Sequence, residues 1–269
     1  MEEQKQNPHN EAVKHHEERE DYPDINSEKS KKTGFQGLVE NLFRQFKNVF
    51  FVLFLLPIAF LYIFCLGVAI SPMMYLLLKA WNFTLYDELW IRAMFLGFGF
   101  GAGAILFILA LIIVVPIVNA PFIPFVRSYR GPWFSIESMA WYYHNALTYL
   151  VRYTILDFIT PSPLNIFFFR AMGMKIGKNV LINSSNISDP CLIILEDNVT
   201  IGGSAFMMAH YGMKGFLIID KLHLKRGAMV GLMAKILGGV TVGKKAVIGP
   251  NAMVLPKTII KDGEKFGIN

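Results

Sequence analysis

The sequence contains few cysteines and few charged side chains. Cys65 and Cys191 are its two cysteines, and they form no Cys-x-x-Cys pair. A disulfide framework is therefore excluded beyond a single bridge, and the composition fits a chain in a reducing compartment. Charged residues make up 17% of the chain and hydrophobic residues 54%, which is unlike an ordinary soluble domain. This shortage of charge predicts membrane segments.

The charge that is present is unevenly distributed. Residues 1–34 hold nine acidic and six basic side chains, a net charge of −3, whereas the whole chain has +6, which leaves +9 for the remainder. The polar segment 1–34 is predicted to be disordered. A basic remainder favours contact with anionic lipid headgroups or with a phosphate-bearing ligand, although charges that only solvate a surface would give the same count.

Two long apolar runs follow the polar tail. The first extends over residues 49–78, with an uncharged core at 50–70, and the second, also uncharged, extends over 93–120. About 20 apolar residues cross a bilayer as a helix, so we expect 35–132 to form a membrane anchor with two transmembrane helices. Small residues permit close packing of such helices, and the second run has a series of them: Gly97, Gly99, Gly101 and Gly103.

Basic residues flank the outer ends of the two runs. Positively charged flanks stay in the cytoplasm, so both the N-terminus and the C-terminal domain are predicted to face the cytoplasm, and an inner (cytoplasmic) membrane is the expected location. The flanking residues are Lys31, Lys32, Arg44, Lys47, Arg127 and Arg130.

Residues 133–172 are too polar to cross a membrane and too aromatic for a plain surface helix. Their aromatic side chains alternate with charged residues such as Glu137 and Arg152, and Pro161 and Pro163 interrupt the segment. We therefore predict amphipathic linker helices that lie at the membrane interface. His144, within this segment, is predicted to be a packed or interfacial residue.

A six-residue period begins near Met174. Small or aliphatic residues occur four positions after each repeating aliphatic residue, and glycines follow several of them. Such a short fixed period is the signature of a solenoid, in which the aliphatic side chain fills a narrow interior. The repeating aliphatic residues are Leu224, Val230, Ile236, Val242, Ile248 and Val254.

This pattern resembles the hexapeptide-repeat acyltransferases over about residues 160–260. The resemblance implies a left-handed parallel β-helix, here expected at 173–263, that uses acetyl-CoA or another acyl-CoA as co-substrate and forms a homotrimer. The membrane part followed by Pro161-Ser162-Pro163-Leu164 and by Arg170–Gly177 is also similar to the C-terminal region of peptide synthetases of the poly-lysine-synthetase type.

The repeat is interrupted once, after His210. We expect Tyr211 to His223 to project as a loop, with the period resuming at Leu224. The family carries its catalytic histidine where a loop leaves a coil, so the resemblance assigns the general base to His210. Imidazole titrates near neutrality and suits this role. Asn186 and Asp189, about one coil earlier, are predicted to contact the acceptor or to orient the imidazole. His223 is predicted to be a surface residue.

The resemblance places the acyl donor along the late coils. The corresponding donor-binding residues are Gly231, Ala234, Gly249 and Lys257, and nearby lysines supply charge for the phosphates of coenzyme A. The sequence departs from the family pattern at Leu232, Pro250 and Leu255-Pro256-Lys257. A longer acyl chain, or a donor bound differently, would fit these departures.

The expected function is therefore O-acyl transfer, most simply acetyl transfer, to a hydroxyl of a lipid-linked or saccharide acceptor at the membrane. A non-catalytic trimeric scaffold is the alternative. A zinc enzyme of the γ-carbonic-anhydrase type is disfavoured because the repeat region holds only His210 and His223, whereas such a site needs three histidines. Neither a metal nor a nucleic-acid partner is expected.

Overall fold

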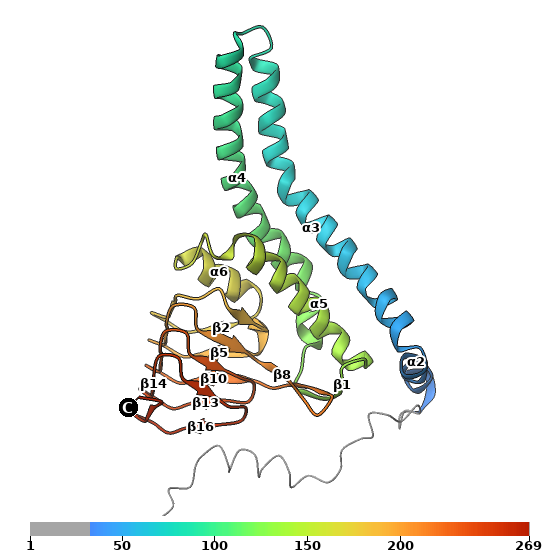
Figure 1. Ribbon diagram of the computed structural model, residues 1–269, viewed down its shortest axis with the longest axis vertical. Helices are drawn as coiled ribbons and strands as arrows, with labels where there is room; N and C mark the ends of the chain where they lie inside the picture. The colour runs from blue at the N-terminus through green and yellow to red at the C-terminus, as the bar shows by residue number, and fades with distance from the viewer. Residues whose placement is uncertain (1–32, 269) are drawn as a thin grey trace, which may run out of the picture.

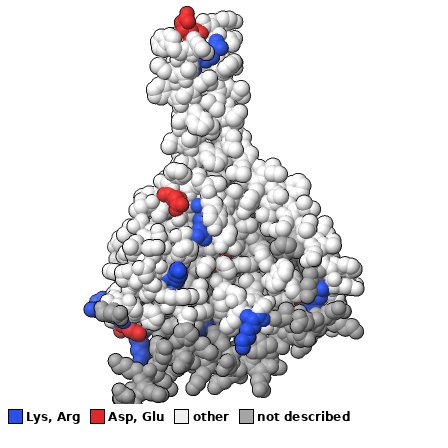
Figure 2. All heavy atoms as spheres, viewed as in Figure 1, with Lys and Arg blue, Asp and Glu red and all other residues white. Residues whose placement is uncertain are grey.

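The computed structural model describes residues 33–268, and the predicted disordered tail lies almost entirely outside this range. After a short helix α2 (Gly34–Gln45), two long helices, α3 (Lys47–Phe83) and α4 (Leu89–Asn119), form an antiparallel hairpin (Figure 1). Residues Val52–Phe83 of α3 and Leu89–Asn119 of α4 are long and apolar enough to cross a membrane, with mean hydropathies of 2.7 and 2.9. Most of their surface is exposed rather than packed in a core, and Figure 2 shows no charged side chain along the shaft of the hairpin on the face drawn.

Two of the four predicted interface glycines lie between the long helices. A Cβ atom on Gly103 would lie 2.6 Å from Cγ of Met73, and one on Gly99 would touch Ala80 and Leu77 of α3. The other two, Gly97 and Gly101, have no atom within 4 Å of that position. Residues four apart share one face of a helix and residues two apart do not, so only half of the series can face α3.

The segment between α4 and the repeat is more deeply packed than an interfacial helix. It comprises a 3₁₀ turn η1 (Ile123–Phe125), strand β1 (Tyr129–Pro132), helix α5 (Ile136–Val151), a π-helical turn η2 (Arg152–Leu156) and helix α6 (Pro163–Ala171). Helix α5 begins at Ser135, whose Oγ accepts a hydrogen bond from the N–H of Glu137. Trp141, Leu147 and Val151 are buried, so α5 joins the two long apolar helices to the C-terminal domain.

The C-terminal domain is a parallel β-helix with three faces, as the six-residue period predicted. Residues 18 positions apart pair in parallel, for example Met229 with Val247 and Lys235 with Met253, so three hexapeptides make one coil. Its three sheets have the orders β16-β13-β10-β5-β2, β17-β14-β11-β6-β3 and β15-β12-β7-β4. This confirms the left-handed parallel β-helix, and its last strand extends three residues past the predicted end.

The strands of the β-helix are short, and their inward side chains form its core. All six repeating aliphatic residues are buried, with at most 1% of any of them exposed. The strands are β2 (Lys175–Ile176), β3 (Leu181–Ile182), β4 (Ile187–Ser188), β5 (Ile193–Leu195), β6 (Thr200–Ile201), β7 (Phe206–Met208), β10 (Leu222–Leu224), β11 (Met229–Val230), β12 (Lys235–Ile236), β13 (Thr241–Val242), β14 (Val247–Ile248), β15 (Met253–Val254), β16 (Ile259–Ile260) and β17 (Lys265–Phe266), with a 3₁₀ turn η3 (Pro190–Leu192) before β5.

The insertion is a hairpin rather than an open loop. Strands β8 (His210–Met213) and β9 (Phe216–Ile219) pair antiparallel, and β9 also pairs with β1. The chain returns to the coil at Leu222, so His223 belongs to strand β10 and pairs with Ile194 and Thr241. The expected boundary at Leu224 was therefore wrong by two residues. Through β1, the hairpin that starts at His210 is connected to the segment that follows the long apolar helix α4.

Candidate active site

His210 lies at the corner where the hairpin leaves the second coil. Its Nδ1 is 2.6 Å from Oδ2 of Asp189, which lies about one coil earlier. The His210 side chain is 18% exposed, whereas that of Asp189 is completely buried. The structure therefore brings together two of the residues singled out in the sequence and places Asp189 as the partner of the imidazole. Contact with an acceptor stays a prediction for both Asp189 and Asn186.

The carboxylate of Asp189 accepts three hydrogen bonds. Besides His210, the backbone N–H of Ala209 donates to Oδ2 at 3.0 Å, and the Trp141 Nε1–H donates to Oδ1 at 2.7 Å. These donors offset the cost of burying an ionised carboxylate. A carboxylate is only an acceptor, so His210 must carry its proton on Nδ1. The opposite nitrogen, Nε2, is then left as the basic atom of the ring.

Trp141 reaches this pair from outside the repeat. Besides its bond to Asp189, its ring packs edge-on against His210 with the centroids 4.8 Å apart. Trp141 is 5% exposed and belongs to α5. The linker helix therefore fixes both members of the pair.

His144 lies one turn along α5 from Trp141 and has a different environment. It is fully buried, and its Nδ1 is 3.0 Å from Oδ1 of Asn119, at the end of α4. Burial lowers the pKa of His144 to about 4, although the nearby carboxylate of Asp189 opposes the shift. His144 is therefore a neutral link between α4 and α5 at neutral pH, which agrees with its prediction as a packed residue.

Acidification is expected to destabilise the folded protein through His144. Because the folded chain keeps this imidazole neutral while the unfolded chain protonates it near pH 6.5, stability falls as the pH drops from about 6.5 to about 4. The difference between these two pKa values corresponds to roughly 3 kcal/mol in the free energy of unfolding, which is present at neutral pH and is lost below about pH 4. Thermal unfolding in mild detergent from pH 7 to 4.5 measures it, with His144→Gln as the variant that cannot titrate. An equal pH slope in both proteins would contradict the assignment.

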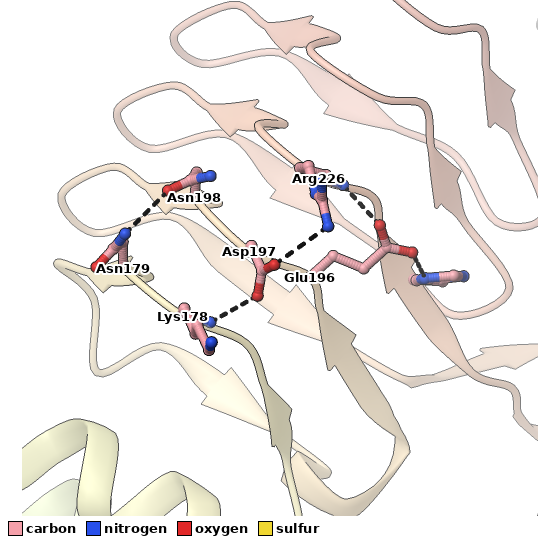
Figure 3. A network of polar contacts seen from close by, with 7 residues as sticks. Lys178, Asn179, Glu196, Asp197, Asn198 and Arg226 are labelled. Carbon is pink, nitrogen blue, oxygen red and sulfur yellow. Dashed lines mark hydrogen bonds and ion pairs between the residues drawn. The ribbon is translucent and has the colours of Figure 1, made fainter.

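His223 belongs to a separate polar network. Its Nε2 is 2.8 Å from Oε1 of Glu196, and the backbone N–H of Arg226 donates to Oε2 of the same carboxylate. Chiefly through that backbone hydrogen bond, the pKa of Glu196 is lowered. Figure 3 shows how Asp197 continues the network to Arg226 and to the backbone N–H of Lys178. The network connects the edges of neighbouring coils, which fits a surface residue better than a catalyst.

Asn186 contacts a cation instead of His210. Its Oδ1 accepts a hydrogen bond from Nη2 of Arg152 at 2.7 Å. No pattern in the sequence pairs these residues, which are 34 positions apart. Across residues 33–268 no group of three His, Cys, Asp or Glu side chains could hold a metal ion.

The predicted donor residues divide between two corners of the β-helix. Gly231 and Gly249 stack at one corner, where a Cβ on Gly231 would lie 2.6 Å from the nitrogen of Pro250. Ala234 is fully buried, and its N–H and carbonyl are both bonded within the coils. Lys257 lies instead at the corner of His210. Their roles in donor binding stay predictions.

The corner of His210 contains a pair of glycines that the sequence analysis missed. A Cβ on Gly238 would lie 2.8 Å from the carbonyl oxygen of Ala209, and the N–H of Lys257 donates to the carbonyl of Gly238. Gly239 has a φ of +82° and packs against Lys257. Three successive coils thus place Ala209, the glycine pair and Lys257 in one column. The pair Gly238-Gly239 was the available signal, although the repeat contains a second such pair at Gly202-Gly203.

Comparison with known proteins gives one sequence likeness. No protein-family model matches the chain. A delta-poly-L-ornithine synthetase from Acinetobacter baumannii (strain AB307-0294) is 29% identical over 106 residues, which are 39% of this chain. The match covers 8% of the length of that relative.

Several solved structures resemble the chain. A hexapeptide-repeat-containing acetyltransferase from Vibrio cholerae O1 biovar eltor, complexed with acetyl coenzyme A, is 19% identical with a TM-score of 0.34, covering 49% of this chain and 87% of that one. A maltose O-acetyltransferase from Clostridium difficile 630 is 16% identical with a TM-score of 0.33, covering 52% and 90%. A serine acetyltransferase from Neisseria gonorrhoeae is 16% identical with a TM-score of 0.29, covering 59% and 66%.

Proposed function

We propose that this chain is a membrane-anchored O-acyltransferase that moves an acyl group from acyl-CoA to a hydroxyl of a lipid-linked or saccharide acceptor. The observation that carries the proposal is the pair of His210 and Asp189, in which a fully buried carboxylate fixes the proton on Nδ1 of a partly exposed imidazole. Such an imidazole is held in the orientation and tautomer that a general base requires.

The reaction needs one protein group that accepts a proton and then gives it up again. The acceptor hydroxyl attacks the thioester carbonyl carbon while Nε2 of His210 takes the hydroxyl proton. The new carbon–oxygen bond replaces the carbon–sulfur bond, and the proton passes to the leaving sulfur, so that coenzyme A departs as a thiol. No covalent enzyme intermediate is required if both substrates are bound together, because positioning supplies much of the rate.

The column of Gly238, Gly239 and Lys257 suits the donor. The two glycines add no side chains to the column, but Gly238 packs against Ala209 and Gly239 is bordered by the side chains of Lys257 and Asp220, so an extended pantetheine arm would lie along the outer edge of the column. Neighbouring strands are about 4.8 Å apart, which places Lys257 roughly 10 Å from the level of His210. Its ammonium is exposed and can bind a phosphate of the donor as a point charge.

Helices α3 and α4 supply the proposed anchor. Their exposed apolar surfaces would be covered by lipid, and the basic flanking residues favour the cytoplasm, where acyl-CoA is made available, for both ends of the chain. The proposed location is an inner (cytoplasmic) membrane. A homotrimer is proposed as well, since the β-helix leaves several apolar side chains about half exposed: Leu181, Met229, Leu232, Met233 and Met253.

The test is acyl transfer in proteoliposomes. Radiolabelled acetyl-CoA is supplied together with lipid and polysaccharide fractions from the host, and label is followed into each fraction. Transfer that requires the protein supports the proposal and identifies the acceptor. If acetyl-CoA gives no transfer, longer acyl-CoAs are tested in the same way. Absence of transfer with every donor would refute the enzyme and favour the non-catalytic scaffold.

A further inference from the structure

Arg152 holds its guanidinium group in a cluster of aromatic rings. It is the first residue of the π-helical turn η2, a local geometry that occurs often at functional sites. Its Cζ lies 5.4 Å from the ring centre of Tyr149, 5.3 Å from that of Tyr153 and 5.8 Å from that of Phe206. These rings stabilise a cation at a fixed position without neutralising it.

The positive charge of Arg152 has no carboxylate partner within the described part of the chain. Its recorded hydrogen bond goes to the neutral amide of Asn186. The ion pairs recorded among residues 33–268 involve Arg44, His210, His223 and Arg226. A guanidinium presents five N–H donors in a planar fork that matches phosphate oxygens. A half-buried arginine bonded to a neutral partner is therefore well prepared to bind an oxyanion.

Arg152 and His210 lie along the same strip of contact between α5 and the β4 region, whose inner residues Ser188 and Asp189 are buried. Helix α5 and its continuation contact the β4 region at three successive places. Trp141 bonds to Asp189, the hydroxyls of Tyr149 and Ser188 are 3.1 Å apart, and Arg152 bonds to Asn186. Asn186 and Asp189 are three residues apart along nearly extended chain, which corresponds to about 10 Å. An acceptor about that long could contact Arg152 at one end and His210 at the other.

The Arg152 end of this strip is bordered by exposed aromatic side chains. Tyr153 is 73% exposed and Phe158 is 82% exposed, and both follow α5 directly. In Figure 1, this end of α5 leads toward α6, close below the helical hairpin. Exposed aromatic residues at such a level are typical of the membrane interface, where lipid phosphates lie.

We propose that Arg152, with Asn186 and the rings of Tyr149, Tyr153 and Phe206, binds the phosphate ester of the acyl acceptor and thereby places the acceptor hydroxyl at His210. The proposal rests on the proposed acyltransferase function and names its acceptor class, a phosphate-bearing alcohol. The phosphate belongs to a lipid headgroup or lipid carrier, or to a soluble sugar phosphate, and the two sources share the chemistry that Arg152 recognises.

Binding without any acyl donor tests the site separately from catalysis. The full-length protein in neutral detergent is titrated with dioctanoyl phosphatidic acid, and dioctanoylglycerol serves as the probe without phosphate. Arg152→Gln is expected to weaken binding of phosphatidic acid at least about tenfold, the effect of losing a charge-assisted pair. Arg152→Lys keeps the positive charge without the planar guanidinium group, and its affinity for phosphatidic acid is expected to fall less than that of Arg152→Gln. Arg170→Gln, which removes an exposed arginine of α6, is the matched control and should bind as the wild type does.

The outcomes are distinct. Equal affinity of Arg152→Gln and wild type, or equal binding of dioctanoylglycerol and phosphatidic acid, would overturn the proposal. Inorganic phosphate is then added to compete with bound phosphatidic acid. If it displaces phosphatidic acid at a similar concentration, the acceptor is a soluble phosphate ester. If it does so only at a far higher concentration, the acceptor is a lipid. The binding measurement does not depend on acyl transfer. A protein that binds phosphatidic acid through Arg152 but transfers no acyl group is therefore distinguished from a protein that transfers acyl groups without this phosphate site. A thermal melt of each variant confirms that it is folded.

Discussion

Replacing Asp189 by Asn is expected to lower the rate of acyl transfer roughly a thousandfold to ten-thousandfold, as loss of the carboxylate does in other histidine–aspartate pairs. An amide can turn its NH₂ group toward Nδ1 of His210, which would then need to be unprotonated. The ring proton would move to Nε2, and that atom could no longer accept the proton of the acceptor. The same change disturbs the bonds from Trp141 and Ala209, so we also expect a loss of about 1–3 kcal/mol of stability.

Asp197→Asn is the matched control for this experiment. Asp197 is a carboxylate of the exposed network and bonds to Arg226 and to the backbone of Lys178. Its replacement should change the rate of transfer less than about twofold, because surface ion pairs contribute little. Rates are measured with saturating donor, and thermal melts report the folded state. Similar losses in the two variants would show that Asp189 has no special part in the reaction.

The β-helix was predictable because its six-residue period can be recognised directly in the sequence. Side chains at every sixth position must fill one narrow interior, so residues such as Ile236 and Val242 could be assigned inward before the structure was known, and both are fully buried. The long helices were predictable for a similar reason, since uncharged runs of this length have few alternatives.

The ends of the insertion were not predictable to the residue. Phe216–Ile219 is an apolar run that could equally belong to a coil, but it pairs with β1, a strand more than 80 residues earlier. Leu222 returns to the coil because it pairs with Ile193. Such pairings depend on where distant strands meet, which no local pattern records.

The linker, residues 133–172, also makes contacts with distant segments that its local sequence pattern does not record. The aromatic residues of 133–172 led to the prediction of an amphipathic helix, but they did not indicate what its apolar face would cover. In the structure that face packs against the β-helix and α4, so Trp141 and His144 are buried and only a few aromatic residues, such as Tyr153 and Phe158, are largely exposed. Residues three apart share a helix face, which was the available signal for grouping Trp141 with His144.

For the candidate site, the repeat indicated that His210 and Asp189 lie near each other, but no pattern indicated the residues that support them. Asp189 was predicted because it lies about one coil before His210, a distance set by the repeat. Trp141 lies 48 positions from Asp189 and Arg152 lies 34 from Asn186, and neither belongs to the repeat. Their positions follow from the packing of α5 on the first coils, which only the structure reveals.

Replacing His210 by Ala is expected to lower the rate of transfer by about a hundredfold to ten-thousandfold, the usual contribution of a positioned general base. Water would then have to take the proton of the acceptor hydroxyl. His210 is at the edge of the coil and 18% exposed, so the replacement removes no core side chain, although the buried Asp189 loses one of its three hydrogen bonds. His223→Ala provides the control, because it removes a histidine of the same domain whose partner is Glu196.

The most direct measurement is the initial rate of label transfer from acyl-CoA to acceptor in proteoliposomes containing wild type, His210→Ala or His223→Ala at equal protein content. The proposed function predicts transfer by wild type and His223→Ala at similar rates, and a loss of at least about a hundredfold with His210→Ala. Equal rates with all three proteins would contradict the assignment of His210 as the base.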